Sequence, residues 1–465
     1  MNKIIDEEKI NNILIQTKNP TKEIIRNILD KAKKKNGLEL KEIGYLINFK
    51  DAELLQELFS IASNIKEEIY GERLVFFAPL YVSNYCMNDC EYCNFHIRNK
   101  ILIREKLSIE EIEEQIKFLI NMGHKRVLLE FGEDAIDNPI DYVVNVIEKI
   151  YSVKTDKGSI HRINVNIAAT TVENYKKLKQ AKIGTYQLFQ ETYHRETYRK
   201  LHRGPKADYD RQITAHERAF EAGIDDFGIG VLFGLYDWRF EVLSLISHAQ
   251  YFDKKYDVGP HTISVPRFRN APEVTYKPEY GVSDDDFLKL IAVLRLAVPY
   301  TGMIISTREK PEIRKLAFKV GISQTSAASN ASPGGYGKKD ENAGHKNAGQ
   351  FILSDHRPLV EVIEDVLNDY LLPSFCTACY RLNRTGKAFM NFAKDGEIHN
   401  FCRPNACLTF AEYLEDFARI EHDSVYKKGY EVINFYLDKI EDENIKKLAT
   451  EKLNKIKHGE RDLFF

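Results

Sequence analysis

The pattern of apolar positions changes near residue 73. Before that point, apolar residues recur at helical spacing among Lys and Glu, which predicts helices over residues 20–34, 40–48 and 52–70. From Arg73 onward, short apolar runs alternate with amphipathic segments, a pattern typical of strands and helices that form a parallel sheet. The first 72 residues are therefore expected to form a helical extension to an α/β domain.

One strand and helix unit illustrates the pattern. Ser108 and Glu111 have the spacing of a capping box, and apolar residues at positions 109, 112, 116 and 119 form one face of a helix. Gly123 is expected to end this helix before a strand over residues 126–131.

Eight strands of this kind are expected. They cover residues 76–82, 126–131, 163–167, 185–189, 226–232, 262–265, 303–306 and 322–325. This number favours a closed (β/α)8 barrel of the TIM type, with its catalytic groups at the C-terminal ends of the strands. An open doubly wound sheet would give the same alternation and is the alternative.

A Gly- and Ser-rich stretch over residues 326–349 suggests the end of the barrel. We therefore expect an N-terminal helical extension over residues 1–72, a barrel over 73–345 and a mostly helical C-terminal domain over 346–465. A helix is expected at 409–420.

The overall composition excludes some function classes. The chain is 43% hydrophobic and 29% charged with a formal net charge of −2, which argues against a nucleic-acid partner. Residues 1–9 lack the apolar run of a signal peptide, and no apolar run is long enough to cross a membrane. A cytoplasmic location is expected.

Seven cysteines fall into two groups, with none between Cys93 and Cys376. Such grouping is unlike a disulfide framework, and in a reducing compartment closely spaced thiols more often bind metals or act in catalysis.

The first group follows the first expected strand. Cys86, Cys90 and Cys93 have Cys-x3-Cys-x2-Cys spacing. Three thiolates can hold three irons of a 4Fe-4S cluster and leave the fourth iron open to an exogenous ligand. A zinc site, with His96 as a further ligand, or buried structural thiols are the alternatives.

The second group comprises Cys376, Cys379 and Cys402. Three thiols again predict a cluster with one open iron, which would bind something that the protein uses or makes. Cys407 is either a fourth ligand or a small buried hydrophobic residue, and a zinc ribbon is the structural alternative for the group.

The Cys86 loop resembles the signature of the radical S-adenosylmethionine (radical SAM) superfamily. This resemblance implies that SAM binds the open iron of the first cluster. It also implies that Tyr92 flanks the SAM adenine and that Gly132 and Glu133 receive the SAM amino group.

With both cysteine groups considered, the chain resembles the HydG family, the radical SAM tyrosine lyases of FeFe-hydrogenase maturation, over residues 74–418. The Cys-x2-Cys-x22-Cys ending separates it from the thiamine-pathway tyrosine lyase. The other segments that carry the resemblance are 164–171, 184–194, 234–239 and 259–264.

The resemblance implies cleavage of L-tyrosine to p-cresol and dehydroglycine. Dehydroglycine would then give carbon monoxide and cyanide at a C-terminal 4Fe-4S cluster that carries an additional labile iron, and these ligands would serve assembly of the H-cluster. By position, His261 would ligate the extra iron. The expected partners are an electron donor, such as a ferredoxin or flavodoxin, and other maturation proteins, including a scaffold.

A tyrosine carboxylate inside a dry barrel needs a bidentate cation, and Arg308 is the candidate because it follows the seventh expected strand. Ser306 and Ser326 are expected beside it. Three residues after the fourth strand are expected to contact SAM or the substrate: Glu191, Thr192 and His194.

Two other functions fit the cysteine pattern. One is a radical SAM lyase or transferase acting on another amino acid, with the C-terminal cluster used only for electron transfer. The other is a carrier that delivers clusters without radical chemistry.

Overall fold

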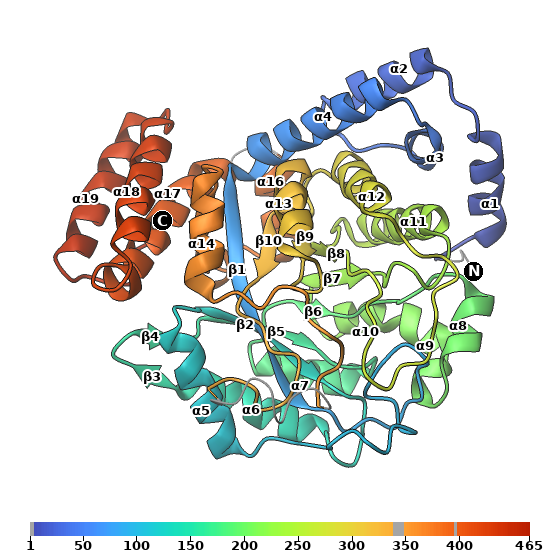
Figure 1. Ribbon diagram of the computed structural model, residues 1–465, viewed down its shortest axis with the longest axis horizontal. Coiled ribbons are helices and arrows are strands. Elements are labelled where there is room, and N and C mark those ends of the chain that lie inside the picture. Colours follow the sequence, from blue (N-terminus) through green and yellow to red (C-terminus); the bar gives the residue numbers. More distant parts are fainter. Residues whose placement is uncertain (1–3, 338–347, 395–397) are drawn as a thin grey trace.

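A closed barrel of eight parallel strands forms the centre of the computed structural model, which describes residues 4–337, 348–394 and 398–465 (Figure 1). The ring closes where β10 pairs with β1, for example Phe77 with Ser326. The strands, in ring order, are β1 (Arg73–Ser83), β2 (Arg126–Phe131), β5 (Arg162–Asn166), β6 (Tyr186–Gln187), β7 (Phe227–Gly230), β8 (Thr262–Ser264), β9 (Gly302–Ile305) and β10 (Gln324–Ser326).

The closed ring confirms the barrel prediction, and the open doubly wound alternative was wrong. All eight expected strands are present. Their residues are almost entirely buried, because the helices outside and the side chains inside cover both faces of a parallel sheet.

The helices that follow the strands surround the ring. Ser108 caps α5 by accepting from Glu111 N–H (3.2 Å), and the Glu111 carboxylate accepts from Ser108 N–H (2.7 Å), as expected. These helices are α5 (Ile109–Asn121), α6 (Ile140–Ser152), α7 (Val172–Gln180), α8 (Arg195–Leu201), α9 (Tyr209–Ile213), α10 (Ala215–Glu221), α11 (Trp238–Tyr256), α12 (Asp284–Ala297) and α13 (Pro311–Val320). A short hairpin of β3 (Lys154–Thr155) and β4 (Gly158–Ser159) follows α6.

The N-terminal extension contains one helix more than the sequence predicts. The four helices are α1 (Glu7–Gln16), α2 (Lys22–Ala32), α3 (Leu40–Asn48) and α4 (Ala52–Tyr70). They pack on the outer helices α11 and α12 rather than on the sheet, at the upper right of Figure 1.

The C-terminal region joins the barrel through a strand that the sequence analysis missed. β11 (Leu372–Ser374) pairs in parallel with the start of β1, outside the closed ring. The boundary expected between residues 345 and 346 lies outside the described residues. The helices of this region are α14 (Leu359–Asn368), α15 (Ala378–Arg381), α16 (Gly386–Lys394), α17 (Ile398–Tyr413), α18 (Asp423–Asp438) and α19 (Glu443–Lys457).

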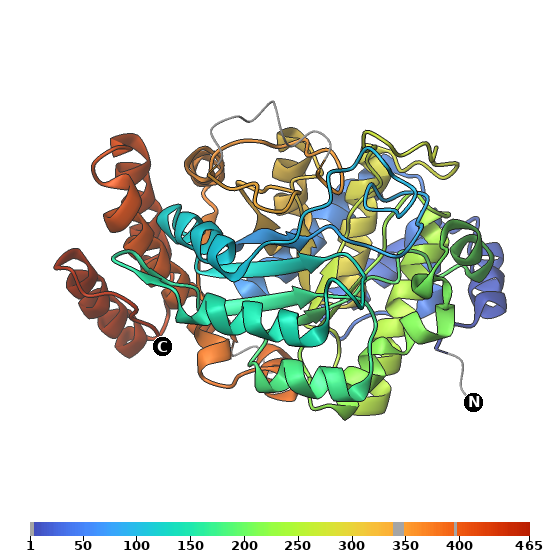
Figure 2. The same cartoon turned by 90° about the horizontal axis from the view of Figure 1, so that it is seen from below.

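The helix expected over 409–420 is only the end of a longer one. α17 begins at Ile398, contains Pro404, and continues as a π-helical turn over Leu414–Ala418. Proline in a helix interior is unfavourable, so the sequence pattern placed the start too late. Figure 2 shows α17, α18 and α19 as a separate layer beside the barrel. No described helix is long and apolar enough to cross a membrane.

Candidate active site and second cysteine site

The first cysteine loop is held against the end of β2. Met87 N–H donates to Glu133 O (2.8 Å), and Gly132 N–H donates to Ser83 O (2.9 Å). A Cβ atom at Gly132 would lie 2.2 Å from Tyr85 O, so only glycine allows this approach. The loop is thereby fixed at the C-terminal mouth of the barrel.

The thiols in this loop suit iron. Cys86, Cys90 and Cys93 are all free. Burial, with a smaller contribution from Cys86, raises the pKa of Cys93 to about 11. Such a thiol stays protonated unless a cation stabilises its thiolate, and the irons of a cluster would provide that charge.

Tyr92 lines the cavity next to this loop, and a neighbouring histidine fixes its position. The Tyr92 hydroxyl donates to His202 Nε2 (2.7 Å), because His202 Nδ1–H donates to Tyr198 O (2.7 Å). The ring therefore has one orientation, as a residue that flanks a flat ligand requires. Its expected contact with the SAM adenine stays a prediction.

Glu133 is engaged with protein groups. Its carboxylate accepts from Asn88 Nδ2 and from Arg211 Nη2, both at 2.6 Å. Neither Gly132 nor Glu133 lines the main cavity, so the expected contact with the SAM amino group also stays a prediction.

The cavity at the mouth, together with the solvent space at its opening, measures about 1000 Å³. Arg308, Ser306 and Ser326 all line it, as does Glu130. The Arg308 guanidinium stacks on Phe351, 3.3 Å from the ring centroid. Arg308 forms no ion pair within residues 4–337, 348–394 and 398–465; the carboxylates of Glu191 and Glu130 act on it only through the electrostatic field, so its guanidinium can still pair with an anionic ligand.

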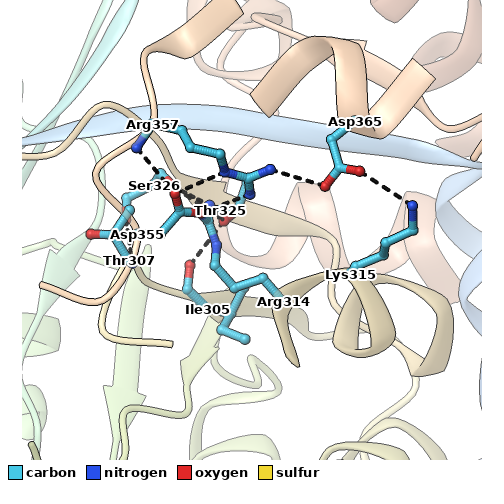
Figure 3. Close-up of polar contacts among 9 residues, drawn as sticks. All are labelled: Ile305, Thr307, Arg314, Lys315, Thr325, Ser326, Asp355, Arg357 and Asp365. Atoms are coloured by element: carbon cyan, nitrogen blue, oxygen red, sulfur yellow. Dashed lines mark hydrogen bonds and ion pairs between the residues drawn. The ribbon is translucent and has the colours of Figure 1, made fainter. Parts of the chain in front are cut away.

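A buried ion network holds the strand ends that carry these residues (Figure 3). Arg314 donates to Asp355, to Thr325 Oγ1 (2.8 Å) and to Ser326 O (2.6 Å). Asp355 N–H donates to Thr307 O (3.1 Å), and Arg357 donates to the Asp355 carboxylate (2.8 Å). The network therefore ties the ends of β9 and β10 to the segment after Phe351.

Of the three residues expected after the fourth strand, only Glu191 lines the cavity. It adopts a positive φ of 67° and forms an ion pair with Lys206 (2.7 Å). Thr192 instead donates to the buried Glu241, and His194 stacks on Tyr236 with a centroid distance of 3.8 Å. The geometry thus gives no support to the contacts expected of Thr192 and His194, because both side chains pack against neighbouring helices.

Several polar residues of the cavity were not predicted from the sequence, among them Glu130, Asn166 and Gln187. Burial raises the pKa of Glu130 to about 8, with Arg308 and Asn166 opposing the shift. The available signal was a lone carboxylate in the apolar strand before Gly132 and a lone amide in the short strand before Glu191.

The second cysteine group lies at the opposite end of the barrel. Because β11 pairs with the first residues of β1, the loop after it reaches the N-terminal ends of the strands. Cys376, Cys379 and Cys402 line one cavity of about 530 Å³ together with His261. Tertiary structure thus unites the four residues that the resemblance assigns to the second metal site.

The walls of this second cavity are cationic. Arg126 donates to Cys376 O (2.9 Å), and Arg73 lies within hydrogen-bond reach of Cys402. The Nε atoms of both arginines are buried without a partner in the described residues. Burial raises the pKa of Cys379 to about 12. Buried cations beside thiols match the negative charge that a thiolate-ligated cluster would carry.

His261 precedes β8 and is held from both sides. Its Nδ1 lies 3.4 Å from Asp226 Oδ2, and its Nε2 accepts from the Tyr380 hydroxyl (2.8 Å). Burial lowers the pKa of His261 to about 4, so the ring is neutral, the form in which histidine binds metals.

Cys407 does not line this cavity. It is fully buried in α17, with its sulfur 3.9 Å from Ile433 O in α18. This placement supports a small buried hydrophobic residue rather than a fourth ligand.

Within the described residues, neither set of three thiols is arranged around one point at which a single metal ion could bind. A 4Fe-4S cluster does not need that arrangement, since each of its cysteines binds a different iron. The three thiols of the second set line one cavity. Of the first set, Cys93 lines the mouth cavity, and Cys86 and Cys93 both lie close enough to Cys90 to act on it electrostatically.

Comparison with known proteins gives consistent matches. The radical SAM superfamily model matches residues 80–244, and the Biotin and Thiamin Synthesis associated domain model matches residues 264–369. The chain is 29% identical over 308 residues to 2-iminoacetate synthase of Salmonella typhimurium, covering 66% of this chain and 78% of that protein.

Two solved structures resemble nearly the whole chain. One is HydG, a maturase of the FeFe-hydrogenase, with 50% identity, a TM-score of 0.95, and coverage of 99% of this chain and 100% of that one. The other is the FeFe-hydrogenase maturase HydG from Carboxydothermus hydrogenoformans, with 43% identity, a TM-score of 0.84, and coverage of 96% and 97%.

Proposed function

Because the chain belongs to the HydG family of radical SAM FeFe-hydrogenase maturases, we propose that it is a tyrosine lyase that supplies carbon monoxide and cyanide for the H-cluster. It cleaves the Cα–Cβ bond of L-tyrosine to give p-cresol and dehydroglycine. Dehydroglycine then divides into carbon monoxide, hydrogen cyanide and water. The observation that carries the proposal is one barrel with three closely spaced thiols after β1 at its mouth and three thiols lining a cavity at its other end.

The residues at the mouth of the barrel bind and orient the cluster, SAM and the substrate. Cys86, Cys90 and Cys93 hold a 4Fe-4S cluster, and Tyr92 flanks SAM. When bound, the cluster and SAM supply the radical that removes a hydrogen atom from the amino group of the substrate. Tyr92, Glu191 and the apolar walls of the cavity keep water away from that radical.

Arg308 anchors the substrate carboxylate. Its guanidinium is held flat on Phe351 and has no carboxylate partner within the described ranges, so a bidentate pair with the substrate costs no existing ion pair. Ser306 and Ser326 line the same part of the cavity and offer hydroxyl donors.

The second site holds a second cluster and an additional labile iron. Cys376, Cys379 and Cys402 bind the cluster, and His261 ligates the extra iron. The neutral imidazole and the cations Arg73 and Arg126 support this assignment.

The protein would act together with an electron donor, such as a ferredoxin or flavodoxin, and with a scaffold protein that accepts its product. A cytoplasmic location fits the chemistry, because a reducing compartment preserves free thiols.

The test is anaerobic reconstitution with iron, sulfide, SAM, a reductant and L-tyrosine. We expect p-cresol in solution and carbon monoxide trapped by a haem protein. SAM cleavage without p-cresol would favour a lyase for another amino acid. Protein that binds iron and sulfide but cannot cleave SAM would instead be a carrier.

A further inference from the structure

Gln187 places one amide among apolar side chains deep in the main cavity. Phe77, Leu128 and Ile304 form a small apolar cluster there, and all three line the cavity. Gln187 also lines it, although its side chain is only 1% exposed. The cavity wall is therefore apolar at Phe77, Leu128 and Ile304 and carries polar side chains at Gln187, Asn166 and Ser264.

Only one of the two polar atoms of the Gln187 amide has a hydrogen-bond partner in the described residues. Its Nε2 donates weakly to Thr262 Oγ1 (3.4 Å), while its Oε1 is buried with no hydrogen-bond partner in the part of the chain described. Buried polar atoms in native proteins usually have partners, so an acceptor that lacks one beside a cavity points to a ligand that provides it.

The neighbouring strand leaves room for this amide. Gln187 is in register with Gly228 of β7. A Cβ atom at Gly228 would lie 3.0 Å from Gln187 Cγ and 2.5 Å from Thr262 Oγ1. Glycine at residue 228 thus leaves the space that the Gln187 side chain occupies.

Arg308 and Gln187 lie at different depths. Arg308 follows the C-terminal end of β9, whereas Gln187 is in register, through Gly228 and Thr262, with Gly302 at the start of β9. The cavity therefore has a cation near its mouth and an acceptor further in, and Phe77, Leu128 and Ile304 are apolar parts of the same wall. Glu130 is less suitable as the deep partner, because its electrostatic neighbours are Arg308, Glu191 and Lys206 at the mouth.

We propose that Gln187 Oε1 accepts a hydrogen bond from the phenolic hydroxyl of L-tyrosine and thereby selects tyrosine over phenylalanine. This specificity contact rests on the proposed function. A site built to pair with a hydroxyl rejects the analogue that lacks it, because its own buried polar atom is then left unpaired.

The first experiment uses the reconstituted wild-type enzyme with SAM, so folding of a variant does not matter. Tyrosine and three analogues compete for binding: phenylalanine, 4-fluorophenylalanine and 4-aminophenylalanine. We expect the two analogues without a donor to bind at least about 100-fold more weakly than tyrosine. The affinity for 4-aminophenylalanine, which keeps a hydrogen-bond donor, should be much closer to the affinity for tyrosine. Equal binding of all three analogues would overturn the proposal.

The second experiment replaces the amide. Gln187→Met keeps the length of the side chain and removes the acceptor, so the preference for tyrosine over phenylalanine should fall to within a few-fold. KM for tyrosine should rise more than kcat falls. Gln187→Glu keeps an acceptor and should retain the preference.

The matched control is Gln212→Met. Gln212 is also buried, but its Nε2 donates to Phe189 O (2.9 Å). Its loss should affect stability without changing the ratio of tyrosine to phenylalanine binding. An unchanged ratio in Gln187→Met, in an enzyme whose wild type makes p-cresol, would refute this inference alone. A wild type that makes no p-cresol would refute the proposed function as well.

Discussion

The Nδ1 atom of His261 lies 3.4 Å from Oδ2 of Asp226. Neither atom has another partner in the described residues. Asp226 is thus the group placed to take up a proton carried on Nδ1, while Nε2, which accepts from Tyr380, is the nitrogen on the side of the second cavity. This is the arrangement by which a carboxylate orients a histidine that binds metal.

The first prediction concerns this pair. Asp226→Asn should weaken iron binding at His261 by roughly 10- to 100-fold, because the tautomer is no longer fixed. The measurement is iron content together with the magnetic resonance signal of the second cluster. Asp225→Asn, one residue earlier, is the control and should keep both. Full iron occupancy in Asp226→Asn would show that the carboxylate has no positioning role.

The second prediction separates the two thiol sets. Replacing Cys376 and Cys379 by Ala should abolish carbon monoxide while p-cresol continues, because tyrosine is cleaved at the other end of the barrel. Cys407→Ala should keep both products, since that residue lies outside the cavity. Loss of both products in the double variant would indicate a structural role for the C-terminal region.

The third prediction concerns the substrate anchor. Arg308→Met should lower kcat/KM for tyrosine by at least roughly 100-fold, because a buried carboxylate would lose its cation. Arg308→Lys should keep only part of the wild-type kcat/KM, since an ammonium cannot form the bidentate pair. Unaltered p-cresol formation in Arg308→Met would remove Arg308 from the substrate site.

The fourth prediction concerns the network in Figure 3. Arg314→Met should lower the free energy of unfolding by about 1–3 kcal/mol, because Asp355 keeps Arg357 but loses its fully buried partner, and Ser326 O loses a donor. Lys117→Met breaks an exposed pair with Glu113 and should change stability by less than about 1 kcal/mol. Denaturant unfolding of the two variants gives the comparison.

The fifth prediction concerns pH. Burial raises the pKa of Glu241 from 4.5 to about 8, while Tyr193 N–H donates to its carboxylate (2.9 Å). The folded protein therefore holds a proton that the unfolded chain releases, and this group's contribution to stability falls as pH rises from 4.5 to about 8. Glu241→Gln does not titrate. The free energy of unfolding of Glu241→Gln, relative to that of the wild type, should therefore increase by at least about 1 kcal/mol as the pH rises from 4.5 to about 8. A constant difference at every pH would mean that Glu241 titrates normally.

Much of the fold could be predicted from local patterns. The eight strands follow from short apolar runs, and the capping box at Ser108 and Glu111 places α5. The first cysteine loop could also be identified because its three thiols lie within eight residues. Such features depend on spacing along the chain, which the sequence contains in full.

Other features depended on contacts between distant residues. Pairing of β11 with the start of β1 brings Cys376 to the same cavity as His261, and no local pattern encodes that register. Gln187 and Glu130 sit in ordinary strand positions and become cavity residues only when the ring closes. Thr192 and His194, expected at the mouth, turn toward neighbouring helices.

The amino-acid sequence by itself thus determined the barrel and the type of metal chemistry, because periodicity and thiol spacing are local properties. Only the tertiary structure decided which side chains share a cavity and which end of the barrel holds the second thiol set. The physical reason is that strand register and helix packing are set by the summed burial of many residues far apart in the chain.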